Sequence, residues 1–476
     1  MKRMPILFAV LFLFSPLFPQ GNPEIVNKII EEGKTRNQVM RHLEHLCIQI
    51  GHRLTGSHNL QKACEWTRDM LASYGLNARL EQWTEIPVGF QRGRTQIGRM
   101  VEPHERIFQF TTRSWTAGTN GLVRGYVVIQ PENVDAIKSR AWQLKNAWVL
   151  VPPAPRQGGP SQEERTAIRN ALREAGINGT ITTSGSELVR TSGTWRNLDI
   201  NNLPTDVDIT VRQSDYQAMT NAINAGSPPL VEFHLEQYFI PGPIPQYNVV
   251  ADIVGTEFPD EYVIVGGHLD SWDGPGSQGT CDNGTGTMVA LEAARILMAS
   301  GAKPKRTIRF ILFTGEEQGL LGSRAYVQQN PQIHDKISAV LIDDGGTNYW
   351  GGLVCIKEME PMLKQATDIL NEAFPDMPFA LRVVERMPRG GGSDHASFNA
   401  VGIPGFFSVE TGVANYPYIH HTQNDNLSAA IEKYLVQSSV AAAVTAYNLA
   451  CADTLLPREQ PTRNDGLKSV VTIRSK

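Results

Sequence analysis

Between about Asn248 and Cys451, short apolar stretches alternate with helical patterns, and this alternation constrains the fold more than any other feature of the sequence. Continuous apolar runs such as EYVIVGG, RTIRFILF and KISAVLI are typical of buried strands, whereas GTGTMVALEAARILMASG has the spacing of a helix. Strands that are buried on both faces and separated by helices form largely parallel sheets. The sequence therefore predicts an α/β fold with a mostly parallel mixed sheet flanked by helices.

Polar side chains follow most of these strands. In parallel sheets the carboxyl ends of the strands share one edge, and α/β folds bind their ligands there. The residues placed in this way are His268, Asp270, Asp282, Glu316, Glu317, Asp343, Asp344, His420 and His421. Each has an ordinary explanation alone, because Asp282 could cap a helix and the two glutamates could form a solvated turn.

Together these groups would be costly to bury without partners. Histidines and carboxylates without cysteine suit zinc or a similar divalent metal. Two such ions that share a bridging carboxylate could act on one hydrolytic water. The pattern therefore predicts a metal site at the sheet edge.

With 476 residues, the chain is too long for one ordinary core. Residues 111–238 contain their own short strand and helix patterns with Pro and Gly clusters such as FIPGPIPQYN, which predicts a small inserted domain. The predicted organisation is a discontinuous larger domain of residues 22–110 and 239–455, the insertion 111–238, and a polar C-terminal tail, 456–476.

The first 21 residues, MKRMPILFAVLFLFSPLFPQG, combine a positive start with a short apolar run. The run is shorter than the roughly 20 residues that span a bilayer, which favours a cleaved secretory signal peptide over an anchor. We therefore expect an exported protein, secreted or periplasmic, without stable membrane insertion after cleavage. The net charge of -4 offers no basic surface for nucleic acid.

Cysteine and histidine pairs near the N-terminus have plain explanations. Cys47 and Cys64 lie in neighbouring helical patterns and could form a disulfide in an exported protein, or remain isolated buried thiols. His42 and His45 lie three residues apart, but HLEHLC lacks the HExxH arrangement of a zinc helix. We expect these two histidines on a solvated helix face.

The motifs GGHLDS, DNGTG, GEEQGLLGS, SDHASF and IHHTQND resemble, in this order, those of the di-zinc exopeptidase family that includes bacterial leucine-type aminopeptidases and the glutamate carboxypeptidases. The resemblance covers roughly residues 247–451, and LCIQIGHRLTGS resembles the family's N-terminal segment. The insertion resembles the protease-associated domain of several members, and its position indicates the branch of plasma glutamate carboxypeptidase. The resemblance implies the zinc exopeptidase fold.

By motif, the resemblance implies a complete set of metal ligands. His268 and Asp344 would bind one zinc, Glu317 and His421 would bind the second, and Asp282 would bridge both. The family's aspartate ligand directly precedes small residues, which selects Asp344 over Asp343. An acidic residue lies four positions after the family's histidine ligand, which selects His421 because Asp425 follows it.

The resemblance also implies roles around the metals. Asp270 would orient His268 from behind, and Glu316 would be the general base that takes a proton from the water and delivers it to the leaving amine. Asp394 and His395 would line the substrate pocket and bind no metal.

Two residues near these motifs are less constrained. His420 is free either to hydrogen-bond the substrate or the tetrahedral intermediate, or simply to pack. Asp273 is expected in a solvated loop or at the pocket rim.

These observations predict an exported metal-dependent exopeptidase that hydrolyses short peptides as an aminopeptidase or dipeptidase. Two zinc ions are expected, with cobalt or manganese as alternatives. The alternatives are a carboxypeptidase of the glutamate carboxypeptidase type, a glutaminyl-cyclase-like aminoacyltransferase with one metal, and a silent binding module. The complete ligand set argues against the last two. The insertion could restrict access to the site or support a homodimer, and its composition favours neither.

Overall fold

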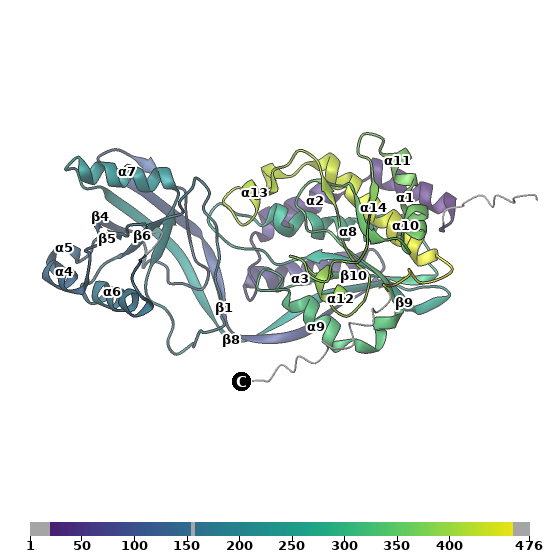
Figure 1. Cartoon of the computed structure of the whole chain (residues 1–476), viewed down its shortest axis with the longest axis horizontal. Helices are drawn as coiled ribbons and strands as arrows, with labels where there is room; N and C mark the ends of the chain where they lie inside the picture. Colours follow the sequence, from purple (N-terminus) through teal and green to yellow (C-terminus); the bar gives the residue numbers. More distant parts are fainter. Residues whose placement is uncertain (1–19, 154–157, 460–476) are drawn as a thin grey trace, which may run out of the picture.

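The computed structural model describes residues 20–153 and 158–459, which form two lobes joined by two long strands (Figure 1). The predicted signal peptide, residues 1–21, lies almost entirely outside the described residues, as does most of the predicted tail, 456–476. Within the described ranges, no helix combines the length and the apolar character needed to cross a membrane.

A mixed sheet forms the base of the large lobe, in the order β15-β11-β9-β10-β8, with β1 on the other side of β8. The first four strands are parallel to one another, β8 is antiparallel to β10, and β1 is antiparallel to β8. The strands are β1 (Asn77–Glu102), β8 (Leu230–Ile253), β9 (Phe258–His268), β10 (Arg306–Phe313), β11 (Ile337–Ile342) and β15 (Gly405–Phe407). The predicted mixed sheet flanked by helices is confirmed.

Helices cover both faces of this sheet, and its central strands β10 and β11 are buried at every position and mostly apolar. Along β10, Phe310 and Leu312 pack into one buried cluster with the helices α8 and α14, while Ile311 and Phe313 pack into another with α9 and α12. Such two-sided burial explains why these strands read as continuous apolar runs. The helices of this lobe are α1 (Pro23–Thr35), α2 (Val39–Glu44), η1 (His45–Ile50), α3 (His58–Ser73), η2 (Thr280–Gly284), α8 (Thr285–Ala299), α9 (Leu321–Gln329), α12 (His395–Asn399), α13 (Tyr416–Ile419) and α14 (Glu432–Cys451).

Smaller elements complete the large lobe. Two short strand pairs, β12 with β16 and β13 with β14, accompany the helices α10 and α11. Their bounds are β12 (Tyr349–Trp350), β13 (Gly352–Ile356), β14 (Ala380–Val384), β16 (Glu410–Thr411), α10 (Glu360–Thr367), α11 (Ile369–Ala373), η3 (Pro331–Lys336) and η4 (Leu427–Ala429).

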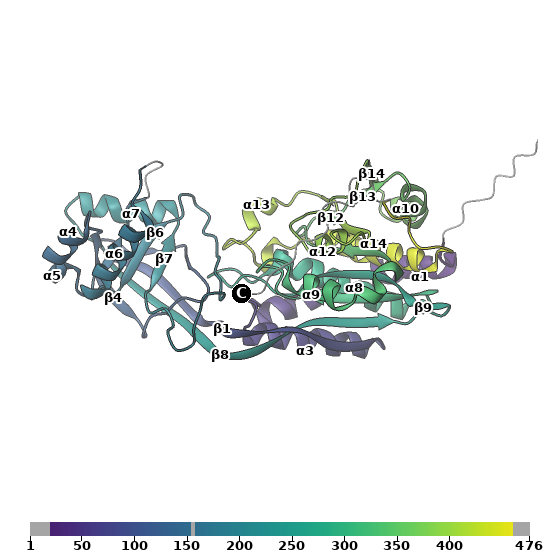
Figure 2. The same cartoon turned by 60° about the horizontal axis from the view of Figure 1, so that its bottom comes forward.

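The strands β1 and β8 run from the large lobe into the small lobe as a twisted antiparallel ribbon (Figure 2). The small lobe is built around the part of this ribbon that extends beyond the large lobe. Its sheet continues from β8 in the order β4-β5-β6-β7-β3, with buried Trp148 and Phe233 in its core. Its elements are β2 (Arg106–Ile107), β3 (Phe110–Thr112), β4 (Val123–Ile129), β5 (Trp148–Leu150), β6 (Gly179–Thr183), β7 (Asp208–Val211), α4 (Val134–Ser139), α5 (Ala141–Leu144), α6 (Gln162–Glu174) and α7 (Gln213–Asn224).

The long β1–β8 ribbon was not predicted, because β8 carries prolines at Pro241, Pro243 and Pro245. Pro241 and Pro245 pair with β1 on one side, and Pro243 lies at an irregularity of that register. Among the described strands, β4 and β10 pair with the other side of β8 only over its two ends, Leu230–Phe233 and Val249–Ile253. A proline lacks the N–H donor but is tolerated where a strand has an open edge. The Pro and Gly cluster therefore lies inside a strand.

Candidate active site

The predicted site residues meet at the carboxyl edge of the parallel strands. His268 is the last residue of β9, Glu316 and Glu317 lie in the turn after β10, and Asp344 is the second residue after β11. Asp282 lies in η2, just before α8, and the His420–His421 pair directly follows α13. The parallel register sets β9, β10 and β11 side by side, with His268 opposite Phe313 at the end of β10. The sheet topology thus brings these distant segments together.

His268 lies at the centre of the first half of the site. Its Nε2 is 3.0 Å from Oδ1 of Asp344, 3.3 Å from Oδ1 of Asp282 and 4.0 Å from Oε2 of Glu316. Burial alone would lower the pKa of His268, but the carboxylates of Asp344 and Glu316 outweigh burial and hold this pKa well above its usual value. One imidazole nitrogen therefore faces three carboxylates in a buried place.

The second half of the site is organised around His421. Its Nε2 lies 3.0 Å from Oε2 of Glu317 and 3.1 Å from Oδ2 of Asp282. Asp282 thus turns Oδ1 toward His268 and Oδ2 toward His421. Burial would raise the pKa of Asp282, but the two histidines together hold it below its usual value. The structure places Asp282 between the two half-sites, as a bridging ligand would need to be.

The histidine nitrogens and carboxylate oxygens of the two half-sites are better suited to bind metal ions than to pair with one another. In the described part of the chain, the ion-pair partners of these carboxylates are histidines and never lysine or arginine. Oδ2 of Asp282 accepts no well-aligned hydrogen bond, although a histidine nitrogen lies 3.1 Å away. Ligand atoms around a tetrahedral zinc ion are about 3.3 Å apart when the bonds are near 2.0–2.1 Å. His268, Asp282 and Asp344 in the first half-site therefore have suitable chemistry and spacing for a metal ion, and around the second half-site the atoms that lie close enough together are those of Asp282, His420 and His421.

Asp270 supports the site from behind. Its Oδ1 accepts a hydrogen bond from the backbone N–H of Glu316 at 3.2 Å, and its Oδ2 accepts from Thr55 Oγ1 at 3.0 Å. Its backbone carbonyl lies 3.0 Å from Nδ1 of His268, the nitrogen that faces away from the carboxylates. A contact of this kind sets the ring orientation of a metal-binding histidine. Asp270 thus ties the His268 ring to the glutamate turn.

The two neighbouring aspartates after β11 point in different directions. Asp344 faces His268, as described above, whereas Oδ2 of Asp343 accepts a hydrogen bond from Trp350 Nε1 at 2.8 Å. Both aspartates are buried. The geometry places Asp344, and not Asp343, in the first half-site.

Glu316 lies next to the first half-site, but its carboxylate is farther from His268 than those of Asp282 and Asp344. Burial raises the pKa of its carboxyl to about 11, and the carboxylates of Asp344, Asp394 and Glu317 act in the same direction. The Glu316 side chain is 11% exposed and lies at the edge of the ligand cluster, where its carboxyl group could exchange a proton with a bound water.

The residues expected in the substrate pocket lie in three different environments. Asp394 is fully buried, neither of its oxygens accepts a well-aligned hydrogen bond, and burial raises its pKa to about 7. The His395 ring packs 5.3 Å from the Phe407 ring, and burial lowers its pKa to about 4. The side chain of His420 is 44% exposed and its ring lies 3.7 Å from the ring of His421. Of the three, His420 is the one open to a ligand from solvent.

Asp273 is not solvated, so the first of its two expected positions is wrong. It is buried, its Oδ1 lies 3.3 Å from Nη2 of Arg92, and it accepts a hydrogen bond from Ser114 Oγ at 2.5 Å. Arg92 belongs to β1 and Ser114 follows β3. The loop after β9 is therefore pinned to the small lobe, which sequence alone could not reveal because these partners lie more than 150 residues away.

Sequence reasoning missed one buried arginine at the site. Arg53 donates its guanidinium hydrogen bonds to backbone carbonyls, among them Leu269 at 2.6 Å and Gly279 at 2.7 Å. These carbonyls belong to the loops that carry Asp270 and Asp282. The GHRLTGS motif that contains Arg53 resembles the family's N-terminal segment, but the motif does not indicate that this arginine is buried.

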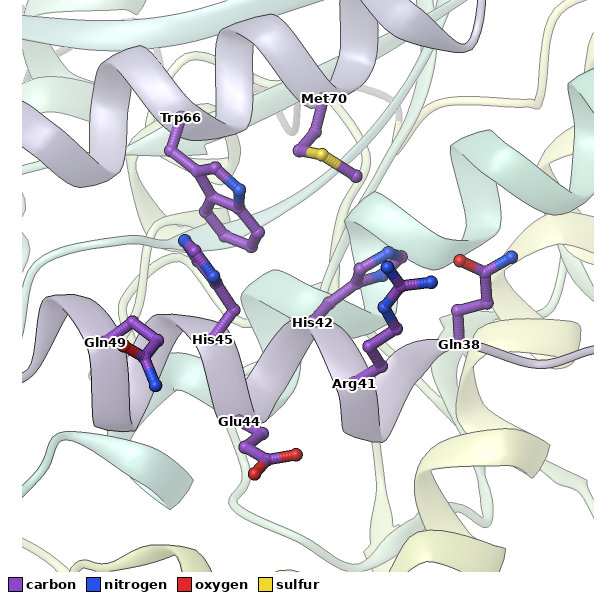
Figure 3. A pocket seen from close by; sticks show the side chains of 8 residues that line it. All are labelled: Gln38, Arg41, His42, Glu44, His45, Gln49, Trp66 and Met70. Atoms are coloured by element: carbon purple, nitrogen blue, oxygen red, sulfur yellow. The ribbon is translucent and has the colours of Figure 1, made fainter.

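The prediction for the histidine pair near the N-terminus was wrong in one of its two residues. His42 is buried, with Nδ1 3.6 Å from Glu292 and Nε2 3.1 Å from the Tyr74 hydroxyl, while exposed His45 stacks 4.5 Å from Trp66. Both line a cavity of about 310 Å³ (Figure 3) that shares no residue with the site described above. The residue pattern of the short helix α2 could not show that α8 covers the side of α2 that carries His42.

All five cysteines are free and buried. Cys47 and Cys64 therefore follow the second of the two expectations, isolated thiols within the core.

Comparisons with known proteins cover nearly the whole chain. The family model described as peptidase family M28 matches residues 248–446. Carboxypeptidase Q from Mus musculus is 27% identical over 434 residues, which cover 90% of this chain and 88% of that protein.

Two solved structures share the fold. The peptidase M28 precursor from Shewanella amazonensis has a TM-score of 0.65 at 21% identity and covers 92% of this chain and 99% of its own. A zinc aminopeptidase from Bacillus subtilis has a TM-score of 0.52 at 19% identity and covers 86% of this chain and 94% of its own. These extents include the small lobe as well as the site.

Proposed function

We propose that the chain is a member of peptidase family M28, a zinc-dependent peptide hydrolase that removes terminal residues from short peptides with two zinc ions. The observation that carries the two-ion proposal is the position of Asp282, whose two oxygens face His268 and His421 separately. His268 and Asp344 would hold one ion, Glu317 and His421 the other, and Asp282 would contact both.

When bound, the ions would lower the pKa of a hydrolytic water and polarise the scissile carbonyl. Glu316 takes the proton from the attacking water and delivers it to the leaving amine, which its position beside the ligand cluster allows. Asp270 keeps the backbone of Glu316 in place during this transfer. His420, which is partly exposed beside His421, is placed to donate a hydrogen bond to the substrate.

The second half-site separates this proposal from a single-metal aminoacyltransferase. Glu317 and His421 lie 3.0 Å apart and share Asp282 with the first half-site. A cyclase with one metal would not need this pair. The same pair argues against a silent binding module, which would have no need to keep a full donor set.

We further propose that the substrates are short peptides with a free amino terminus, and that the protein is exported. The alternative is a carboxypeptidase, which is the activity in the name of the mouse relative. The apolar N-terminal run supports export.

The test is the zinc content of the purified protein together with hydrolysis of aminoacyl anilides, dipeptides and amino-terminally blocked peptides. Two zinc equivalents with cleavage of unblocked substrates would support the proposal. Cleavage of blocked peptides at their carboxyl end would instead identify a carboxypeptidase. One equivalent of zinc, or none, in an active protein would contradict the two-ion site.

A further inference from the structure

The two half-sites differ in what supports them. His268 ends a central strand, and its hydrogen bonds go to Asp270, Asp344 and Thr287, all in the large lobe. His421 follows a short helix at the side of the large lobe that faces the small lobe (Figure 1). Its backbone has φ = 61°, in the left-handed region that a non-glycine residue adopts only when its surroundings hold it there.

Residues 187–196 of the small lobe, here called the strap, hold the His421 loop. The backbone N–H of Thr191 donates to the carbonyl of His421 at 3.1 Å. The Gln423 side chain accepts from the N–H of Val189 at 3.0 Å and donates to the carbonyl of Glu187 at 3.0 Å. The strap therefore contacts the loop at His421 itself and again two residues later.

The strap also reaches the glutamate turn and the loop after β9. Nη2 of Arg196 donates to the backbone carbonyl of Gln318 at 2.7 Å, one residue after Glu317. A Cβ atom at Gly274 would lie 1.8 Å from Oγ1 of Thr191, so this loop approaches the strap too closely for any larger residue. Both protein ligands that are specific to the second half-site, Glu317 and His421, thus lie next to strap contacts.

Apolar packing anchors the strap itself. Trp195 is buried in a cluster with Trp115 of the small lobe and Trp272 of the large lobe, and the rings of Trp115 and Trp195 are 5.4 Å apart. The Trp272 ring lies 6.0 Å from the His421 ring, and the Trp272 backbone N–H donates to Oε1 of Glu317 at 3.2 Å. The cluster is therefore continuous with the second half-site.

We propose that the strap is a positioning device for the second metal site, so that the small lobe controls zinc affinity at Glu317 and His421 but not at His268 and Asp344. Gln423 and Arg196 are positioning residues in this scheme, because they act on the backbone beside the ligands. The inference rests on the two-ion function proposed above. It gives the small lobe a role in completing the catalytic centre.

The test uses the full-length protein, with zinc affinity measured by competition against a chromophoric chelator. Gln423→Ala removes the bonds to Glu187 and Val189, and Arg196→Ala removes the exposed tether to Gln318. In each variant we expect one zinc equivalent, the one assigned to Glu317 and His421, to lose about 10- to 100-fold in affinity, the range typical for partners that orient metal ligands, while the affinity for the other equivalent stays unchanged. Gln217→Ala is the matched control, because this exposed glutamine bonds within α7 to Asn221.

Thermal unfolding of the zinc-free proteins shows whether a variant has lost its fold. Unchanged affinity for both equivalents in Gln423→Ala and Arg196→Ala would overturn the inference, and so would an equal loss at both sites. If the variants give either of these results while the unmodified protein binds two zinc equivalents and cleaves peptides, only the inference about the strap is overturned, and the two-ion proposal stands. An unmodified protein that binds fewer than two equivalents would overturn the inference together with the two-ion proposal.

Discussion

At the scale of single residues, the site depends on how adjacent, chemically similar side chains are given different tasks. Glu316 and Glu317 are neighbours, yet Oε2 of Glu317 lies 3.0 Å from His421 while Glu316 lies beside the first half-site, 4.0 Å from His268. Asp343 and Asp344 divide in the same way between Trp350 and His268. Backbone direction at the end of each strand decides which carboxylate faces a histidine of the site.

Replacing the proposed base should separate catalysis from metal binding. We expect Glu316→Gln to keep both zinc equivalents and to lower kcat by about 10²- to 10⁴-fold, because the amide cannot accept the proton of the water. Kinetics on an aminoacyl anilide, with zinc content measured on the same preparation, would check this. Glu358→Gln, at an exposed glutamate, is the control. A variant with near-normal kcat would remove Glu316 from the mechanism.

Replacing the shared carboxylate should affect both ions at once. We expect Asp282→Asn to weaken both zinc sites by more than the roughly 10- to 100-fold seen for outer partners of metal ligands, because each oxygen of Asp282 faces one half-site. Chelator competition measures both affinities. The exposed Asp376 provides the control variant Asp376→Asn. Loss of one equivalent with the other intact would show that Asp282 is not shared.

At the scale of secondary structure, helices that pack on both faces of the sheet bury the core of the large lobe. α2 and α3 pack beside α8, where a buried ion network joins Arg295 to Glu32 and Glu292. His42 on α2 is buried against this network, and burial lowers its pKa to about 4. Its ring is thus held neutral within the helical layer.

This buried histidine predicts acid sensitivity of the fold. Between pH 6.5 and 4 the unfolded chain binds a proton at His42 that the folded chain does not, so the free energy of unfolding should fall on acidification, by up to about 3 kcal/mol. Glu292, whose pKa is raised by burial, opposes this trend, so the comparison must be made with His42→Gln. Urea unfolding of the zinc-free proteins across this range should show a shallower fall in the variant. Parallel pH profiles would contradict the prediction.

At the scale of the whole molecule, two lobes share one continuous sheet and meet again beside the site. The first junction between the lobes is the β1–β8 ribbon, whose two strands run from one lobe into the other. Asp273 with Arg92, and the contacts of residues 187–196 with the His421 loop, provide the second junction. The site thus lies where segments from both lobes are held together.

Zinc should therefore stabilise the whole molecule. A ligand that binds the folded state contributes about 2.7 kcal/mol per site when its free concentration is 100 times Kd. We expect a chelator to lower Tm by several degrees and to abolish peptide hydrolysis, with both restored by zinc. Scanning calorimetry with added magnesium as the control measures this. An unchanged Tm after verified zinc removal would show that the ions do not hold the segments together.

The sequence by itself determined the sheet, the helices that follow its central strands and the order of the site motifs. Local spacing is sufficient there because strands buried on both faces must be continuously apolar, and because polar residues directly after them can go only to the sheet edge. The choice of His268, Asp282, Glu317 and Asp344 as neighbours in space follows from that rule. Their roles as ligands rest on the family resemblance.

Only the tertiary structure decided the features that depend on distant partners. The Pro and Gly cluster of β8 lies inside a strand because one edge of that strand is open. Asp273 is buried because Arg92 and Ser114 reach it from the small lobe, and His42 is buried because α8 lies against α2. The left-handed His421 is held by a segment some 230 residues away. Local sequence patterns report which side chains are apolar, but not which surface will cover a polar one.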